Sequence, residues 1–219
     1  MPHRFLAEKE EFCMIKFASL IVFCMMLASP GTLSQTAPKI YTIDSSKSSF
    51  WVFAGKAGLF SALAHDHEIG IKTFNGKVIV DDIAKAAGSI EMEVESSSLA
   101  VLDKNVSDAD RAKIRDSMHN EVLESTKYKK ISFKSAGMSD VKAAGNNAYT
   151  FTLNGDLTLH GVTKRIAVPV SLTITPQQLR ASGKYVLRQT DFGIKPYSAG
   201  GGTVKVKNDV TVNFDIVAR

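Results

Sequence analysis

Two histidines separated by a single residue are the first candidates for chemistry in this sequence. His65 and His67 lie in the stretch LAHDHE. On a β-strand, residues two positions apart point to the same face, so both imidazoles could bind one zinc ion. A third protein ligand would then have to come from Glu68, His119 or His160. An H-x-H pair alone is a weak motif. Two other roles therefore stay open: a hydrogen-bonded cluster at a turn or barrel rim, and a polar contact with a ligand head group.

Other catalytic motifs are weaker still. His160 is out of phase with Leu157 and Leu159, so we expect it to be a solvated turn residue. The serines at 96–98 lack a recognisable nucleophile motif. The glycines at 200–202 lack the Lys-Ser pair and helix that follow a phosphate-binding loop. The sequence therefore predicts no catalytic residues, cofactor or resident metal, with the His65 and His67 pair kept as an alternative metal site or enzyme centre.

Composition and charge narrow the class of protein. The chain has 219 residues, of which 44% are hydrophobic and 22% charged, and this is typical of one globular domain with a sizeable core. The formal net charge is +5, and basic residues are scattered among acidic ones. This pattern gives little support to nucleic-acid binding, whereas transient contact with an anionic membrane surface stays open.

The N-terminal region has the layout of a secretory signal peptide. Lys16 precedes an apolar run from Phe17 to Leu27, and small residues follow. The run is about half the length of a membrane-spanning helix, which needs ~20 residues. We therefore predict a signal peptide over residues 1–37, with Met14 as an alternative start, and an exported domain over residues 38–219.

The cleavage site and the cysteines follow from this assignment. Cleavage after Ser34 or after Ala37 would leave a small residue at the junction, and the sequence does not choose between them. In either case Cys13 and Cys24 leave with the signal peptide. The mature domain is then expected to lack disulfides, thiolate metal sites and a cysteine nucleophile.

From Ile40 onward, apolar residues recur at every second position, which predicts β-strands. Ser89–Ser96 is the clearest case, because Ile90, Met92 and Val94 alternate with glutamates. The other predicted strands are Phe50–Ala54, Val78–Val80, Phe151–Leu153, Leu157–Leu159, Ile166–Ile174, Tyr185–Leu187 and Val210–Ile216.

Turns and one helical excursion separate these strands. We predict turns at Phe74–Gly76, Gly145–Asn147, His160–Gly161, Ser182–Gly183 and Gly200–Gly202. The exception is Asp103–Lys130, where Ser107 or Asp108 could cap a helix. The predicted fold is all-β, with about eight antiparallel strands that stack as a sandwich or close as a barrel. An eight-stranded barrel can be filled by its own side chains or can hold one small ligand.

The ordered segments resemble a known family. They are YTIDSSKSSF, FNGKVIVDD, SIEMEVESSSL, ISFKS, NGDLTLHGVTK and TDFGI, and together they resemble the YceI-like family from Tyr41 to the C-terminus. The resemblance implies an extended, lipocalin-like antiparallel β-barrel in the bacterial periplasm. It also implies an isoprenoid lipid, such as a quinone or polyprenyl chain, held inside the barrel, and no catalytic residues.

Two features depart from the widely shared family pattern. Lys130 stands where a proline is common before the ISFKS strand, and Arg115-Asp116 is followed by a polar stretch, so the helical segment is expected to sit differently. The LAHDHE stretch occurs in only a subset of YceI-like sequences. That subset lends no function to His65 and His67.

Alternating positions on the strands give the candidate lining of the barrel. The predicted ligand-binding residues are Phe50, Val52, His65, His67, Phe74, Val78, Val80, Ile90, Met92, Val94, Phe133, Phe151, Leu153, Leu157, Leu159, Val168, Val170, Phe192 and Phe214. The same residues could instead fill a solid core.

Surface recognition is the remaining functional alternative. If the barrel is filled, the protein would act as an interaction module through its outer surface. Trp51 and Phe53 face away from Phe50 and Val52, so we expect them to pack under the helical segment or to form a partner surface. A homodimer also stays open.

Overall fold

The structure is a computed structural model that describes residues 37–58 and 65–219. Residues 1–36 of the predicted signal peptide, which include Cys13, Met14 and Cys24, lie outside the described residues. None of the described helices is long and apolar enough to cross a membrane.

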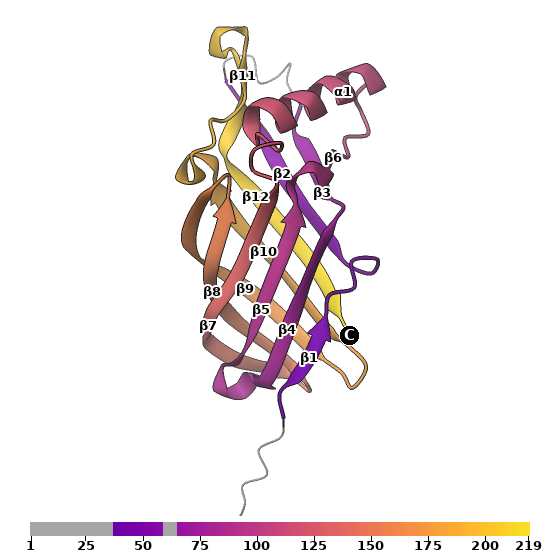
Figure 1. Cartoon of the computed structure of the whole chain (residues 1–219), viewed down its shortest axis with the longest axis vertical. Helices are drawn as coiled ribbons and strands as arrows, with labels where there is room; N and C mark the ends of the chain where they lie inside the picture. Colours follow the sequence, from indigo (N-terminus) through magenta and orange to yellow (C-terminus); the bar gives the residue numbers. More distant parts are fainter. Residues whose placement is uncertain (1–36, 59–64) are drawn as a thin grey trace, which may run out of the picture. The chain divides into compact units, whose positions relative to one another are not determined.

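Twelve strand segments form one antiparallel sheet (Figure 1). They are β1 (Lys39–Thr42), β2 (Ser49–Ala57), β3 (His67–Ile71), β4 (Phe74–Asp82), β5 (Ala87–Glu95), β6 (Leu99–Val101), β7 (Lys130–Gly145), β8 (Ala148–Leu159), β9 (Val162–Ile174), β10 (Leu179–Arg188), β11 (Ser198–Ala199) and β12 (Val204–Ala218). The predicted all-β, lipocalin-like antiparallel fold is confirmed.

Ten of these segments, all except β1 and β11, occupy eight positions around the barrel, because two pairs of them act as long bent strands. Only Lys72 and Thr73 separate β3 from β4, and a single 3-10 turn, Ser96–Ser98, separates β5 from β6. β3 pairs with β6 just as β4 pairs with β5. The remaining positions belong to β7, β8, β9, β10, β12 and β2. The predicted number of about eight therefore describes the barrel wall.

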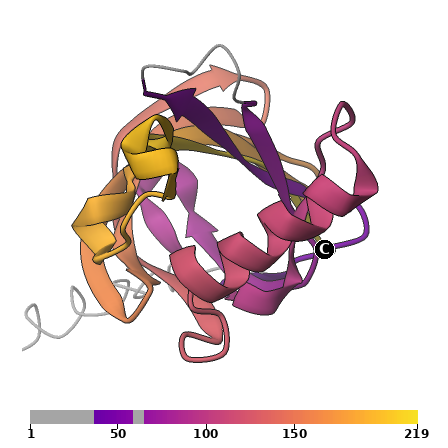
Figure 2. The ribbon, with the colours of Figure 1, turned by 90° about the horizontal axis from the view of Figure 1, so that it is seen from above.

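The short first strand joins the two sides of the sheet at the end where the chain terminates. β1 pairs with β4 along Lys39–Thr42. At the last residue of that ladder, the Thr42 amide donates to the Arg219 carbonyl at 2.7 Å, and the Arg219 amide donates to the Thr42 carbonyl at 2.9 Å. These bonds satisfy backbone groups that an open sheet edge would leave unpaired. The sheet therefore curls round on itself, as Figure 2 shows from above.

Two predicted turns are wrong, because their glycines lie inside strands. Phe74–Gly76 begins β4, and Ser182–Gly183 lies within β10. A Cβ on Gly76 would come within 2.5 Å of the Glu91 carbonyl, and one on Gly183 within 2.4 Å of the Pro169 carbonyl. These glycines therefore permit close approach of neighbouring backbones and do not reverse the chain.

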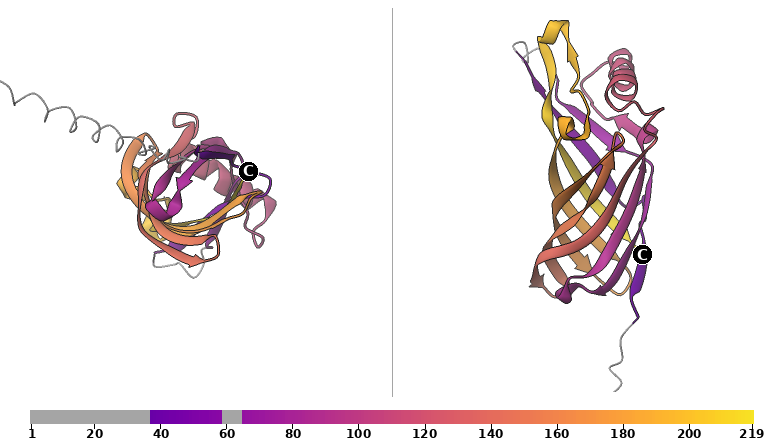
Figure 3. Two further views of the ribbon diagram at one scale, coloured as in Figure 1. Left: turned by 90° about the horizontal axis from the view of Figure 1, so that it is seen from below. Right: turned by 60° about the vertical axis from the view of Figure 1, so that its left-hand side comes forward.

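The helical excursion forms as predicted and lies at one end of the barrel. Helix α1 (Asp108–Ser117) is capped by Ser107, whose hydroxyl accepts a hydrogen bond from the Asp110 amide. A π-helical turn, Met118–Val122, continues it. Seen from above, α1 crosses part of the barrel end, and the side views place the C-terminus toward the other end (Figures 2 and 3).

The ladder between β9 and β10 covers only part of β9. β9 pairs with β10 only from Val170 to Ile174, and Pro169 comes next. Proline has no N–H to donate to a neighbouring strand. The segment after β10 packs near the unpaired part of β9, because the Cβ position of Gly193 is 3.8 Å from Val162. A 3-10 turn, Gln189–Phe192, begins this segment, and Phe192 is 2% exposed.

Candidate ligand-binding site

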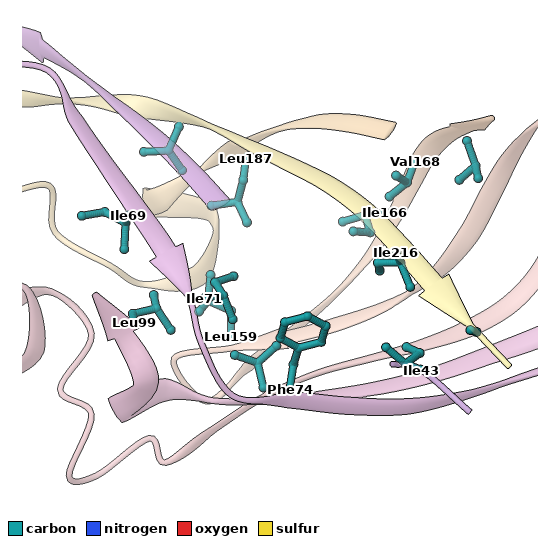
Figure 4. Close-up of a cluster of buried hydrophobic side chains, with 14 of the residues drawn as sticks. Ile43, Ile69, Ile71, Phe74, Leu99, Leu159, Ile166, Val168, Leu187 and Ile216 are labelled. Carbon is teal, nitrogen blue, oxygen red and sulfur yellow. The ribbon is translucent and has the colours of Figure 1, made fainter. Parts of the chain in front are cut away.

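The barrel encloses an apolar cavity of about 420 Å³. This volume falls in the range of ligand sites, which is roughly 300–1,000 Å³. Every strand of the wall contributes side chains, and Ile114 and Met118 contribute from the helical segment. The close-up in Figure 4 shows side chains from several strands, including Ile69, Leu187 and Ile216, converging on the interior. The barrel therefore has an open, apolar interior and is not a solid core.

Strand register arranges the lining in successive layers. Leu187, Val210, Ala54 and His67 are cross-strand neighbours in one row. The next row toward the other end contains Tyr185, Val212, Val52 and Ile69. Side chains two residues apart on a strand share a face. A layer with one histidine therefore adjoins layers that are almost wholly apolar.

The floor of the cavity lies at the start of β10. Leu179 lines the cavity, is 2% exposed, and pairs with Ala218 and Ile174. At ~3.3 Å per residue, the path along β10 from Leu187 to Leu179 is about 26 Å. The interior is therefore long and narrow, a shape suited to an extended chain.

Polar lining gathers at the helix end. His67 lines the cavity there, and its Nδ1 lies 2.7 Å from Oδ2 of Asp103. The other carboxylate oxygen of Asp103, Oδ1, accepts a hydrogen bond from the Glu68 amide, with an N–O distance of 2.7 Å. The backbone carbonyl of Asp103 accepts from the Arg111 guanidinium on α1. These bonds fix both the His67 ring and the loop that leads into the helix.

The two histidines of the LAHDHE stretch have different environments. β3 begins at His67, so His65 precedes the strand, is exposed and does not line the cavity. The expectation that both imidazoles share one strand face is therefore wrong. Among the described residues, no group of three histidine, cysteine, aspartate or glutamate side chains is arranged to hold a metal.

Most of the predicted lining residues do line the cavity; three do not. The residues placed on the lining are Phe50, Val52, His67, Val78, Val80, Ile90, Met92, Val94, Phe133, Phe151, Leu153, Leu157, Leu159, Val168, Val170 and Phe214. Besides His65, the exceptions are Phe74 and Phe192, which are buried elsewhere in the core. The Phe74 ring packs edge-on against Phe50 at 5.9 Å, and Phe192 lies in the 3-10 turn after β10. Ligand binding by the lining residues stays a prediction.

Sequence reasoning missed lining residues that follow the same alternation. Val212 and Ile216 flank the predicted Phe214 on the inner face of β12, and Tyr185 and Leu187 lie on the inner face of β10. Continuing the alternation of inward and outward residues along β10 and β12 assigns all four of these residues to the lining. Asp103 carried no such signal, because it belongs to a loop 36 residues from its partner His67.

The other two described histidines hold loops in place. His119 Nε2 lies 3.0 Å from the Leu99 carbonyl, and His119 Nδ1 lies 2.9 Å from Ser125 Oγ. His160 was expected to be solvated, but its side chain is only 10% exposed because it packs against the Tyr128 ring at 4.2 Å. Its Nε2 lies 2.8 Å from Oε2 of Glu124, at ion-pair distance but without the alignment of a hydrogen bond.

The outward aromatic residues lie on the opposite side of the wall. Phe53 is 45% exposed and pairs across strands with Thr211 and Glu68, so the expectation that the helical segment covers it is wrong. Trp51 is half-buried on the same outer face. A role for these two residues in partner binding stays a prediction.

Tyr185 offers a spectroscopic reporter inside the cavity. Burial raises the pKa of its phenol above the usual value of about 10, and the Asp191 carboxylate adds to the rise. We expect a late phenolate transition in an absorbance titration, absent in Tyr185→Phe. Because the pKa of Tyr185 is higher in the folded than in the unfolded protein, its contribution to the free energy of unfolding is fully present below about pH 10. That contribution is lost as the pH rises through the folded-state pKa. Bound lipid should raise this pKa further, and an unchanged titration would show that lipid does not reach Tyr185.

Comparison with known proteins identifies related sequences and folds. The family description "YceI-like domain" matches residues 41–218. A UPF0312 protein of Pseudomonas savastanoi pv. phaseolicola is 30% identical over 158 residues, which cover 68% of this chain and 72% of that protein. A UPF0312 protein of Pseudomonas syringae pv. syringae matches to the same extent.

Two solved structures share the fold. BcnA of Burkholderia cenocepacia has a TM-score of 0.62 and 22% identity, covering 81% of this chain and 99% of that one. A polyisoprenoid binding domain from Saccharophagus degradans, implicated in plant cell wall breakdown, has a TM-score of 0.58 and 13% identity, covering 82% and 97%. At these identities the likeness shows the fold.

Proposed function

The chain belongs to the YceI-like family, and on that premise we propose that it is a periplasmic carrier or sequestering protein for a long isoprenoid-type lipid, such as a quinone or polyprenol. The observation that carries the proposal is the apolar cavity of about 420 Å³ inside the barrel. A similar fold belongs to the Saccharophagus degradans domain described as polyisoprenoid binding. The proposed role is binding without catalysis.

Physical chemistry supports an apolar, chain-like ligand. Burial of apolar surface contributes about 25 cal/mol per Å², so a narrow aliphatic interior can hold a long tail without a charged anchor. The shape also matters, because the path from Leu187 down to Leu179 on β10 suits an extended chain better than a compact one. The absence of a catalytic motif in the sequence agrees with binding alone.

The proposed location depends on the N-terminal segment. Its short apolar run and small residues predict export, and a carrier in the periplasm would shield a water-insoluble tail between membranes. Fractionation of cells that express the full chain tests this directly. Recovery of a shortened protein with the periplasmic contents is expected, and a full-length cytoplasmic product would contradict export.

The test of the carrier role is native mass spectrometry of protein purified from its own membrane-containing extract. We expect a near-stoichiometric adduct that organic extraction releases as an isoprenoid lipid. Metal analysis of the same sample separates the alternatives. An empty barrel that contains zinc would favour the metal site at the LAHDHE stretch, and an empty, metal-free barrel would favour a surface role for Phe53 and its neighbours.

A further inference from the structure

We propose that His67 and Asp103 form a head-group subsite that selects lipids with a hydroxyl group, through a hydrogen bond from that hydroxyl to Nε2 of His67. The inference rests on the proposed lipid-binding function and specifies the chemistry at one end of the cavity. It also gives a role to His67, which the apolar lining alone does not explain. His65 has no part in this subsite.

The carboxylate fixes which ring nitrogen carries the proton. Nδ1 of His67 is 2.7 Å from Oδ2 of Asp103, and a carboxylate only accepts hydrogen bonds. Nδ1 of the neutral ring must therefore donate, which leaves Nε2 with its lone pair. None of the described residues pairs with Nε2. His67 thus presents on the cavity lining an unpaired ring nitrogen that accepts a hydrogen bond and cannot donate one.

The carboxylate is itself held in one orientation. The Glu68 amide donates to Oδ1 of Asp103 at 2.7 Å, and the Asp103 side chain is 8% exposed. The imidazole is only 18% exposed. A hydrogen bond made in such a sheltered place is stronger than one in water, and an unpaired polar group there is costly. The pair is therefore rigid enough to discriminate between head groups.

The position of His67 suits a head group whose tail continues into the barrel. His67, Ile69 and Ile71 alternate along the inner face of β3, so the lining becomes apolar immediately beyond the imidazole. Ile69 is 7% exposed and Ile71 is 8% exposed. A lipid with its tail among these residues would carry its first polar atom to the level of Nε2.

The lining at this end holds other polar side chains, of which Lys113 and Gln189 already have partners and Ser117 and Tyr197 carry hydroxyls. Lys113 of α1 pairs with Asp110 at 3.2 Å, and its side chain is 79% exposed. The side-chain amide of Gln189 donates to the Lys207 carbonyl at 2.8 Å. A hydroxyl such as that of Ser117 or Tyr197 can donate as well as accept, so it would not distinguish an alcohol from an ether, whereas Nε2 of His67 only accepts.

The test compares two lipids with the same tail: farnesol, which donates a hydrogen bond, and farnesyl methyl ether, which does not. One net hydrogen bond is worth about 0.5–1.5 kcal/mol, so the wild-type protein should bind farnesol about 2- to 12-fold more tightly. Kd values would come from displacement of a fluorescent fatty probe. Equal affinities in the wild type would overturn the subsite and leave the carrier role standing.

Asp103→Asn supplies the sharpest variant, because it reverses the donor and acceptor roles. The carbonyl oxygen of the new side-chain amide would still accept the Glu68 amide, which turns the NH₂ group toward Nδ1 of His67. Nδ1 must then accept, and Nε2 carries the proton. Both lipids have an oxygen that can accept from Nε2–H, so the preference for farnesol should disappear, mainly through tighter binding of the ether.

Two further variants separate selection from folding. His67→Phe keeps the ring shape and removes the acceptor, so both lipids should bind with similar Kd values. His65→Ala changes the exposed histidine and should keep the wild-type preference. A wild-type preference retained in Asp103→Asn, with the fold intact by circular dichroism, would overturn the inference. Failure of every protein to bind either lipid would instead overturn the carrier role, and the subsite with it.

Discussion

Replacement of Leu153 with tryptophan is expected to weaken binding of long isoprenoid lipids by about 100-fold or more, with little effect on folding. Leu153 is on β8, lines the cavity and is only partly buried. The larger indole would occupy space that a tail needs, and exclusion of one five-carbon unit leaves about five carbons unburied at ~0.8 kcal/mol each. Because free space already exists beside Leu153, the strain of overpacking should be small.

Thr150→Trp is the matched control. Thr150 lies on the same strand but on its exposed, outer face, so the same indole there should leave lipid affinity unchanged. Both variants would be measured by displacement of the fluorescent probe, with urea unfolding as the check on stability. Equal affinity of Leu153→Trp and the wild type would show that the tail does not pass Leu153, and binding through the outer wall would then have to be considered.

The alternation of apolar residues made most of the barrel predictable. Strands such as β5 and β8 have one buried face, and a shift by a single residue would expose it, so the inner face is fixed by local sequence. This is why the sequence alone assigns residues such as Met92 and Leu157 to the lining. The Ser107 cap and the helix that follows it were local signals of the same kind.

Features that depend on contacts between distant segments were not predictable. The glycines of β4 and β10 looked like turns, because the carbonyls they approach, Glu91 and Pro169, come from neighbouring strands. His160 looked solvated, because the Tyr128 ring that covers it comes from a separate loop. In each case local chemistry was ambiguous and tertiary packing decided the outcome.

The candidate head-group site shows the same limit. Period two alone places His67 with the apolar lining residues, but its state depends on a carboxylate from the loop before α1. That loop reaches β3 because β3 pairs with β6, which directly precedes it. A sequence pattern can therefore suggest which histidine faces inward, whereas the proton position on its ring follows only from the folded barrel.

The floor of the barrel should be the most sensitive part of the wall. Leu179→Ala is expected to lower the free energy of unfolding by about 2–5 kcal/mol, since removal of a buried leucine side chain loses transfer free energy and leaves a void. Leu179 is 2% exposed and closes the cavity at the end away from the helix. Val186→Ala on the same strand is the control. Val186 is 51% exposed, so the loss should be under about 1 kcal/mol.

Lipid makes this experiment informative about function as well as stability. A ligand that binds only the folded protein raises the free energy of unfolding by an amount that grows with its concentration. If the tail reaches Leu179, saturating lipid should recover part of the loss in Leu179→Ala, because the tail can fill the void that the substitution creates. If lipid stabilises Leu179→Ala no more than it stabilises Val186→Ala, the tail stops short of the floor, and only the upper layers of the barrel, from His67 downward, form the binding site.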